Sequence, residues 1–364
     1  MISTTIFPGR YVQGYDTMKR LGEEMARFGK KGLLICDPYV MERIIPSYLP
    51  DIQHAVQVET VRFGGECSEE EIQRLAQLMK DTGCDLVTGV GGGKTLDTAK
   101  AVAYQMKAPV VVVPTIASTD APCSALSVIY KPDGTFDHYL ILPQNPNLVL
   151  VDTRVVVQAP ARFLVAGMGD ALATWFEAES ARAKYAQNMT GDHGSMAAFA
   201  LAELCYETLL EYGVAAKEAC AVHAVTPAVE HVVEANTLLS GIGFESGGLA
   251  AAHAIHNGLT VLEQTHSYYH GEKVAFGTLT SLFLTDKPIS LVDEVFLFCE
   301  AVGLPTTFAD LGMEGVSDDD LIKVAETACA EGETIFNEPI PVTPEGVVAA
   351  MKAADAYGRM RQGE

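Results

Sequence analysis

The sequence predicts an α/β domain built on a parallel sheet, followed by a domain made of helices alone. Up to about residue 160, short apolar runs alternate with helical patterns, which is typical of a parallel sheet. Residues 85–103 read as a buried strand, a glycine turn and a helix. After Pro160, long Ala- and Leu-rich segments show helical periodicity and few strand candidates. We therefore expect an α/β domain over 1–160 and a helical domain over 161–364.

The elements expected in the first domain are short and alternate in type. Ser68 and Glu71 have the spacing of a capping box and mark one helix start. Pro132-Asp133-Gly134 separates two runs at 125–130 and 135–142 that contain β-branched and aromatic residues, which predicts a β-hairpin. In chain order, the other expected elements are a helix at 15–28, strands at 32–36 and 54–63, a helix at 68–81, a strand at 85–90, a helix from Lys94, and strands at 109–113 and 148–151.

The glycine turn predicts a binding site for a phosphate-containing ligand. Gly91, Gly92 and Gly93 permit backbone angles that a Cβ would forbid, and the helix behind them presents free N–H groups to an anion. Neither common phosphate motif is met. A P-loop would need Gly at position 88, which is Thr88, and G-x-G-x-x-G would need Gly at position 94, which is Lys94. A plain strand-to-helix connection would account for the same glycines.

Composition excludes several classes of partner. The 364 residues are 48% hydrophobic and 20% charged, an ordinary globular balance for two domains. The net charge of −22 argues against nucleic acid or an anionic membrane surface. The sequence shows no signal-peptide pattern and no apolar run of membrane-spanning length. Eight scattered cysteines without a C-x-x-C pair predict reduced, buried thiols in a cytoplasmic protein.

Most histidines lie in the half of the sequence that is expected to be helical. His253 and His256 share one face of an Ala-rich segment, and His266 and His270 follow in THSYYHGEK. Imidazoles gathered on a small-residue helix are a common basis for metal sites, although buried, hydrogen-bonded histidines explain the pattern equally well. Asp170 is either a hard metal ligand or an acid in the first turn of a helix, where the dipole favours it.

Breaks between the helices of this half are expected near Gly191, Gly213, Pro227, Gly247, Gly271, Pro288, Gly303, Gly312 and Pro341.

Five motifs in fixed order resemble the iron-containing alcohol dehydrogenase superfamily. They are GGGKTLDTAK, PTIASTDAP, GMGDALATW, GLAAAHAIHNGL and HSYYHGEKVAFG, and the resemblance extends to about residue 310. Within the superfamily, the glycerol dehydrogenases are the most similar group, and they share Lys94 after the three glycines. The resemblance implies a Rossmann-like NAD-binding domain, a helical metal-binding domain and a cleft between them, which is the dehydroquinate synthase-like fold.

The resemblance also implies the roles of individual residues. The metal ligands would be Asp170, His253 and His270, and Asp120 would contact the substrate beside the nicotinamide; Asp120 and His253 are the expected catalytic residues. The iron enzymes place a fourth ligand, His, where this chain has Thr174, which favours zinc. The expected NAD-binding residues are Asp37, Gly93, Lys94, Asp97, Thr115, Ser118, Ser124, Leu126 and Tyr130.

The implied reaction is the NAD-dependent oxidation of glycerol and other small vicinal diols to products such as dihydroxyacetone, with one divalent metal ion, Zn²⁺ being favoured. Related proteins are often octamers, so a homo-oligomer is expected. A competing hypothesis is a different enzyme of the same fold, such as a dehydroquinate synthase-like or sugar-phosphate dehydrogenase protein. Such enzymes need cationic clefts, and the expected cleft segments offer mainly Lys94 and Lys273. The glycine turn alone would also suit a nucleoside-triphosphate-binding protein or a nucleotide-binding protein without catalysis.

Overall fold

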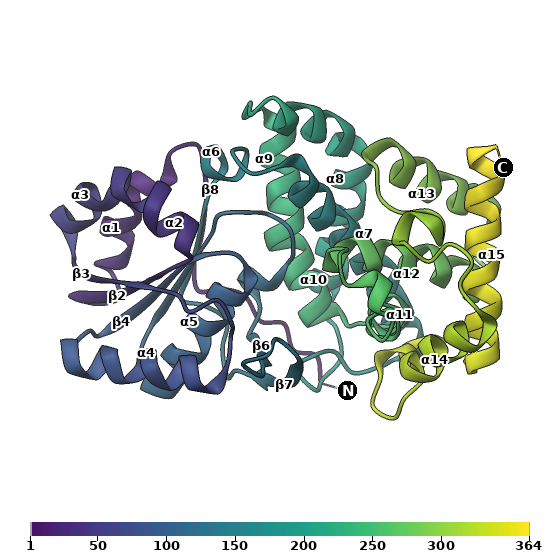
Figure 1. Cartoon of the computed structure of the whole chain (residues 1–364), viewed down its shortest axis with the longest axis horizontal. Coiled ribbons are helices and arrows are strands. Elements are labelled where there is room, and N and C mark those ends of the chain that lie inside the picture. Colours follow the sequence, from purple (N-terminus) through teal and green to yellow (C-terminus); the bar gives the residue numbers. More distant parts are fainter. Residues whose placement is uncertain (1, 364) are drawn as a thin grey trace. The chain divides into compact units, whose positions relative to one another are not determined.

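The computed structural model describes residues 2–363, which form two compact units (Figure 1). The first, called the sheet unit, contains Ile6–Ala161 and Ala219–Gly241. The second, called the helical unit, contains Arg162–Glu218, Ile242 onward and the N-terminal residues up to Thr5. The sheet unit therefore takes back a helical segment from the second half of the chain, in addition to the residues before the boundary expected at 160.

The sheet unit contains the strands of the molecule and the short helices between them. Its elements are β1 (Tyr11–Gly14), η1 (Thr17–Arg20), α1 (Leu21–Met25), β2 (Lys31–Cys36), α2 (Pro38–Arg43), α3 (Ile45–Ala55), β3 (Gln57–Arg62), α4 (Glu69–Thr82), β4 (Leu86–Gly91), α5 (Gly93–Met106), β5 (Val110–Pro114), η2 (Ala121–Cys123), β6 (Leu126–Tyr130), β7 (Phe136–Ile141), β8 (Leu148–Asp152), α6 (Thr153–Val156), α9 (Pro227–Glu234) and the π-helical turn η3 (Ala235–Leu239).

Six strands form one parallel sheet in the order β1-β8-β5-β4-β2-β3. The chain moves outward from β2 to β3 and then returns to the other side of β2 to form β4. Such a reversal of direction leaves a crevice at the carboxyl ends of the two strands, and ligands of open α/β sheets bind there. The glycine turn after β4 and Asp37 after β2 both lie at this reversal.

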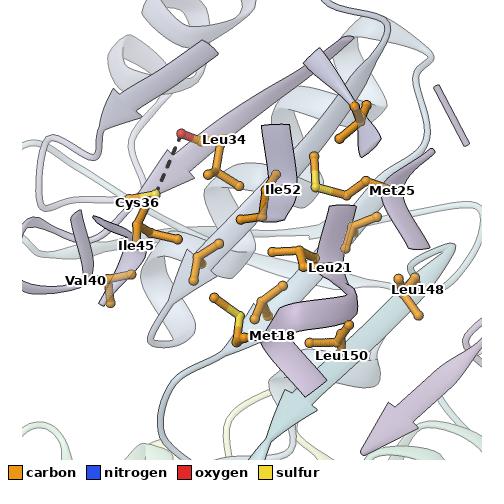
Figure 2. Packing of buried hydrophobic residues seen from close by; sticks show 14 of the residues in the cluster. Met18, Leu21, Met25, Leu34, Cys36, Val40, Ile45, Ile52, Leu148 and Leu150 are labelled. Atoms are coloured by element: carbon orange, nitrogen blue, oxygen red, sulfur yellow. Dashed lines mark hydrogen bonds between the residues drawn. The ribbon is translucent and has the colours of Figure 1, made fainter. Parts of the chain in front are cut away.

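One face of the sheet is covered by η1, α1 and α3 and carries the main apolar core of this unit. Figure 2 shows Met18, Leu21 and Met25 packed with Leu34 and Ile52, all at most 1% exposed. Leu34 and Cys36 alternate with Leu33 and Ile35, so successive side chains of β2 point to opposite faces, and both faces are buried. This burial on both sides explains the uninterrupted apolar run that predicted the strand.

Most elements of the first half agree with the predictions, but the helix expected at 15–28 is divided into η1 and α1, the short helices α2 and α6 were not predicted, and three further details differ. The strand β1 and the helix α3 were not predicted, because Tyr11–Gly14 is short and α3 contains Pro46 and Pro50. The capping box is half formed: the Ser68 hydroxyl accepts a hydrogen bond from Glu71 N, but the Glu71 carboxylate accepts from Gly64 N and pairs with Arg74.

The helical unit contains the longest helices of the molecule. Its elements are α7 (Ala161–Lys184), α8 (Met196–Ala221), whose last residues belong to the sheet unit, α10 (Ser240–Gly247), α11 (Ala251–Leu259), η4 (Glu263–Thr265), α12 (His270–Leu284), α13 (Ile289–Val302), η5 (Ala309–Leu311), α14 (Asp318–Ala328), η6 (Thr334–Asn337) and α15 (Pro344–Gln362).

Two local predictions in this half are wrong. The helix α8 continues through Gly213 without a break, because a Cβ there would lie 2.7 Å from the Phe298 ring and the glycine instead allows close packing. Asp170 does not lie in a first helical turn: α7 begins nine residues earlier, and the helix dipole offers it no stabilisation there.

The buried thiols agree with the sequence. Seven of the eight cysteines are buried and all eight are free, and burial raises the pKa of Cys36 to about 12. Among residues 2–363, no helix combines the length and the apolar character needed to cross a bilayer.

Candidate metal and nucleotide sites

Three side chains from three helices of the helical unit meet at one point. Asp170 of α7 is 1% exposed, and its Oδ1 lies 3.4 Å from His253 Nε2 of α11 and 3.1 Å from His270 Nε2 of α12. One ligand atom of each residue lies within 4.8 Å of those of the other two. One carboxylate oxygen and two imidazole nitrogens are donors that suit a divalent metal such as zinc.

Glycines next to two of these residues allow their helices to touch. A Cβ on Gly169 would lie 2.3 Å from the Gly271 carbonyl oxygen, and a Cβ on Gly271 would lie 1.8 Å from the Ala166 carbonyl oxygen. Backbone contact between α7 and the start of α12 therefore requires glycine at both positions. The break expected near Gly271 is present, since α12 begins at His270, and Gly271 in its first turn brings His270 against Asp170.

A buried carboxylate holds the His253 ring. Glu177 is 1% exposed, and its Oε2 lies 2.6 Å from His253 Nδ1. Its Oε1 accepts hydrogen bonds from the backbone N–H groups of Ala250 and His253, at 2.9 and 3.0 Å, so the same carboxylate caps α11. With Nδ1–H donated to Glu177, the Nε2 lone pair of His253 faces Asp170. A carboxylate behind a histidine ligand is a common arrangement in metal sites.

A chain of hydrogen bonds behind His270 sets its tautomer in the same way. Asn257 donates its amide to Glu333, so its Oδ1 accepts from His256 Nδ1 at 3.2 Å. His256 Nε2 is then an acceptor, and His270 Nδ1–H donates a hydrogen bond to it at 3.0 Å. The Nε2 atom of His270 is left as a lone pair directed at Asp170. A cation bound between the two Nε2 atoms and the Asp170 carboxylate would therefore be held by lone pairs of all three residues.

The pKa directions show that this cluster favours a positive charge between its carboxylates. Burial opposes the ionisation of Asp170, but the neighbouring His270 and His253 hold its pKa well below the ordinary value. Burial opposes a charge on His253 too, but the adjacent Glu177 and Asp170 together outweigh it and raise the pKa of that ring. Burial lowers the pKa of His256 well below its ordinary value, consistent with a neutral ring in the chain described above.

Two further residues singled out in the sequence lie outside this cluster. His266 is exposed, and its Nε2 bonds to the Thr260 carbonyl oxygen at 2.9 Å. Thr174 lies one turn after Asp170 on α7 and is fully buried, and a Cβ on Gly243 would lie 2.4 Å from its methyl group. The position thus carries a methyl group packed against a neighbouring helix and no imidazole.

The expected nucleotide residues of the sheet unit gather at the carboxyl ends of β5, β4 and β2, which are neighbours. Asp37 follows β2, and its backbone N–H donates to the Val90 carbonyl oxygen of β4 at 3.1 Å. Thr115 follows β5 and donates its N–H to the Gly91 carbonyl oxygen at 3.0 Å. The N-cap residue of α5 is Gly92, which has no side chain to cap the first turn of the helix beginning at Gly93. This edge therefore presents a helix N-terminus beside a carboxylate.

Close approach explains only the first of the three turn glycines, Gly91, whose φ of +158° is also one that other residues rarely adopt, as the sequence predicted. A Cβ on Gly91 would lie 3.0 Å from the Asp37 Cβ and 2.9 Å from the Thr95 hydroxyl. Gly92 has an extended backbone, φ −87° and ψ −179°, that any residue adopts, so the prediction of forbidden angles is wrong for it. A Cβ on Gly93 would meet no atom within 4 Å, which leaves open space at the start of α5.

The hairpin β6–β7 supplies further expected residues. Lys94 Nζ pairs with Glu66 Oε2 at 2.7 Å and lies 4.7 Å from the centre of the Tyr130 ring. Burial raises the pKa of Tyr130 to about 12, so its hydroxyl stays neutral. Asp97 is 6% exposed, and its Oδ2 accepts from Val128 N at 3.1 Å, which binds β6 to α5. Ser124 is buried, and Ser118 and Leu126 are half-buried.

Asp120 is held by a residue that the sequence alone did not reveal. Its Oδ2 accepts a hydrogen bond from the Ser240 hydroxyl at 2.8 Å, and both side chains are buried. Ser240 follows the π-helical turn η3, whose Asn236 donates to the Ala117 carbonyl oxygen at 3.0 Å. A Cβ on Gly241 would lie 3.1 Å from the Asp120 carbonyl oxygen. π-Helical turns often occur at functional sites, but a single inserted residue leaves no periodic signal in the sequence.

Glu177 and Glu338 were not predicted from the sequence either, although one signal was present. Glu177 follows Asp170 by seven residues, which places both on one face of a helix. Glu338 comes from the segment after η6, and its Oε1 accepts from Ala251 N at 3.1 Å. The start of α11 is thus capped by two buried carboxylates.

Glu338 leads to a prediction about stability against pH. Burial raises its pKa to about 7, with Glu177 adding to the shift and Lys287 opposing it. The folded state then holds a proton that the unfolded state has lost, so the unfolding free energy falls as pH rises from about 4.5 to about 7. Glu338→Gln keeps an oxygen acceptor for Ala251 N and removes this fall in the unfolding free energy, because glutamine does not ionise. We expect urea denaturation to show the variant about 2–3 kcal/mol more stable than the parent at pH 8.

At pH 5.5 the gain from Glu338→Gln should be clearly smaller. Glu331→Gln changes an exposed glutamate in the same connection between α14 and α15, and it should alter stability little at either pH. An equal gain for Glu338→Gln at pH 5.5 and pH 8 would show that its charge does not titrate in this window.

Comparisons with known proteins find similar chains and structures over the full length of this chain. The family model described as iron-containing alcohol dehydrogenase matches residues 8–153. A glycerol dehydrogenase from Thermotoga maritima is 66% identical over 362 residues, covering 100% of this chain and 99% of that protein. A glycolaldehyde reductase from Halobacterium salinarum is 48% identical and covers 98% of both. The crystal structure of glycerol dehydrogenase from Schizosaccharomyces pombe superposes with a TM-score of 0.95 at 39% identity, covering 100% of this chain and 92% of that one.

Proposed function

The chain belongs to the iron-containing alcohol dehydrogenase family, and we propose that it oxidises glycerol and other small vicinal diols with NAD and one divalent metal ion. It is an oxidoreductase, as the full-length similarity to glycerol dehydrogenases indicates. The observation that carries the proposal is the convergence of Asp170, His253 and His270 on one point. Glycerol loses a hydride from its secondary carbon to NAD and a proton from the hydroxyl, giving dihydroxyacetone and NADH.

Asp170, His253 and His270 hold the metal in this proposal, and zinc suits them best. A divalent ion bound there supplies Lewis-acid stabilisation of negative charge worth several kcal/mol. The set of one oxygen and two nitrogen donors, with Thr174 where iron enzymes have histidine, favours zinc over iron. Glu177 and His256 keep the two rings in the tautomer that presents Nε2. His253 additionally forms a wall of the substrate pocket.

The sheet unit binds NAD through the carboxyl edge of its sheet. The N-terminus of α5 at Gly93 and Lys94 receives the pyrophosphate, and Asp37 hydrogen-bonds a ribose hydroxyl. Asp120, oriented by Ser240, binds the substrate hydroxyl or relays its proton. The remaining proposed contacts to NAD are Asp97, Thr115, Ser118, Ser124, Leu126 and Tyr130.

One assay tests the proposal: NADH formation from glycerol before and after chelation, with readdition of Zn²⁺ or Fe²⁺. We expect activity that chelation removes, that zinc restores better than iron, and that 1,2-propanediol also supports. Glycolaldehyde with NADH is measured alongside, because one relative at 48% identity is a glycolaldehyde reductase. A kcat/KM for glycolaldehyde far above that for glycerol would reassign the substrate, and activity unchanged by complete metal removal would refute the metal.

The substrate prediction concerns charge and the position of the second hydroxyl. Asp120 is a carboxylate, so a phosphate on the substrate meets like charge, which costs several kcal/mol at a contact. Losing one hydroxyl contact at a polar site costs about 1–3 kcal/mol. We therefore expect kcat/KM for 1,3-propanediol to fall about tenfold or more below that for 1,2-propanediol, and glycerol phosphates to be poorer still. Equal values for glycerol and glycerol phosphate would favour a sugar-phosphate enzyme.

The homo-oligomeric state expected from the family stays a prediction, as does the cytoplasmic location. Light scattering behind a sizing column measures the first directly.

A further inference from the structure

A lysine in the sheet unit is enclosed completely. Lys100 of α5 is 1% exposed, and it is among the largest fully buried side chains of the described residues. An unpaired buried ammonium is strongly unfavourable, so its partners are informative about its role. Lys100 appears in none of the expected nucleotide contacts, although it closes the GGGKTLDTAK motif.

Backbone carbonyl oxygens make up most of its environment. Lys100 Nζ donates to the carbonyl oxygens of Ala121, Ser124 and Leu126 at 2.9, 3.3 and 2.5 Å. It also pairs with Asp97 Oδ1, one turn earlier on α5, at 3.0 Å. The three carbonyls belong to one short segment that folds around the ammonium. A bound cation surrounded by carbonyl oxygens would organise a loop in the same way.

The segment held by Lys100 carries proposed site residues. It begins directly after Asp120 and includes Ser124 and Leu126. Asp97 extends the attachment, since its Oδ2 accepts from Val128 N and its carbonyl oxygen accepts from the Ser127 hydroxyl at 3.0 Å. Two residues one turn apart on α5 therefore fix residues 121–128 to the helix that begins at the glycine turn.

We propose that Lys100 is a positioning residue that acts as a built-in cation. Its ammonium holds Asp120, Ser124 and Leu126 in register with the N-terminus of α5, so that the nucleotide edge and the substrate carboxylate keep one geometry. The role of this geometry in binding NAD and substrate rests on the proposed function, whereas the ordering of residues 121–128 by Lys100 does not.

Two variants of Lys100 separate the charge from the side-chain volume. Lys100→Met keeps an unbranched stem without charge, and Lys100→Ala leaves a space lined by carbonyl oxygens. We expect KM for NAD to rise roughly tenfold or more in both, with a fall in kcat for glycerol. Ammonium or methylammonium chloride should restore activity several-fold in Lys100→Ala, and sodium or tetramethylammonium chloride should not. No salt should restore Lys100→Met, because its side chain fills the space.

Lys80→Ala is the matched control, since Lys80 is exposed at the end of α4 and the same amines should leave that variant unchanged. The proposal would be overturned if Lys100→Met kept the parent's KM for NAD and kcat for glycerol, or if amines raised the activity of Lys80→Ala as much as that of Lys100→Ala.

Amide hydrogen exchange decides the question without turnover. In Lys100→Met, amides of residues 121–128 should lose protection while those of β2, β4 and β5 keep it. Protection that is unchanged, or lost evenly across the sheet unit, would overturn the positioning role, even if Lys100→Ala fails to fold. If the parent protein makes no NADH from glycerol, the proposed function fails, and this exchange measurement still decides the role of Lys100.

Discussion

Replacing any one of Asp170, His253 or His270 by Ala should lower kcat/KM for glycerol by about 10³-fold or more and remove the bound metal. The expected size follows from the several kcal/mol of charge stabilisation that a metal supplies, at about 1.4 kcal/mol for each factor of ten. The three side chains converge from three different helices, each with its own packing, so the fold should survive each change. Elemental analysis of the purified variants measures metal content, and circular dichroism measures the fold.

The chain offers a matched control for the histidine variants. His266→Ala removes an exposed imidazole four residues before His270. The His266 ring bonds to the Thr260 carbonyl oxygen and lies outside the cluster around Asp170. Metal content and activity should stay at the parent level there. Full metal content in His270→Ala would contradict the assignment of His270. It would point to His256 as the ligand, since His256 Nε2 lies 3.0 Å from His270 Nδ1 in the parent.

Periodicity predicted the elements where one residue type dominates. The strands β2, β4, β5 and β8 are buried on both faces, so their sequences are continuous apolar runs. The short strand β1 has no such run, since its four residues are all half-buried at the edge of the sheet. The helix α3 was hidden by two prolines. Local pattern thus recovers the interior strands and the edge strand β3 better than the short edge strand β1.

The return of Ala219–Gly241 to the sheet unit could not be predicted from composition. This segment is as helical as the residues around it, so no shift in residue type marks the change. Its attachment depends on individual polar contacts, such as Gln13 and Thr153 with the Glu230 carboxylate at 3.0 and 2.7 Å. Contacts between residues more than 70 positions apart leave no trace in a single sequence.

The candidate sites divide in the same way. The motif residues were visible because glycines, histidines and acids cluster in short stretches, and the family resemblance supplied their roles. The residues that hold them in place are dispersed: Glu177 behind His253, Ser240 beside Asp120, and Lys100 beneath the segment 121–126. Each is recognisable only once the fold brings it to its partner, because its residue type alone has many other uses.

The protein should prefer NAD over NADP by about 100-fold or more in kcat/KM, and Asp37 should account for most of that preference. Asp37 lies at the carboxyl end of β2, where its Cβ is 3.0 Å from the Cβ position of Gly91 in the glycine turn. A carboxylate that accepts hydrogen bonds from ribose hydroxyls there would repel a 2′-phosphate, and like charges in contact cost several kcal/mol. Steady-state kinetics with both cofactors measures the preference, and equal values in the parent would remove Asp37 from this role.

Asp37→Asn isolates the charge from the local structure. The Asp37 side chain caps α2 by accepting from Tyr39 N at 2.9 Å, and asparagine is an equally good helix cap, so α2 should remain intact. We expect kcat/KM with NADP to rise about tenfold or more while that with NAD falls, because a charged hydrogen-bond partner of the ribose is replaced by a neutral one. Asp51→Asn, at an exposed aspartate on α3, should change neither value. A fall with both cofactors in Asp37→Asn would indicate that the residue supports the edge of the sheet without discriminating the ribose, and would leave the cofactor preference to different residues of the nucleotide site.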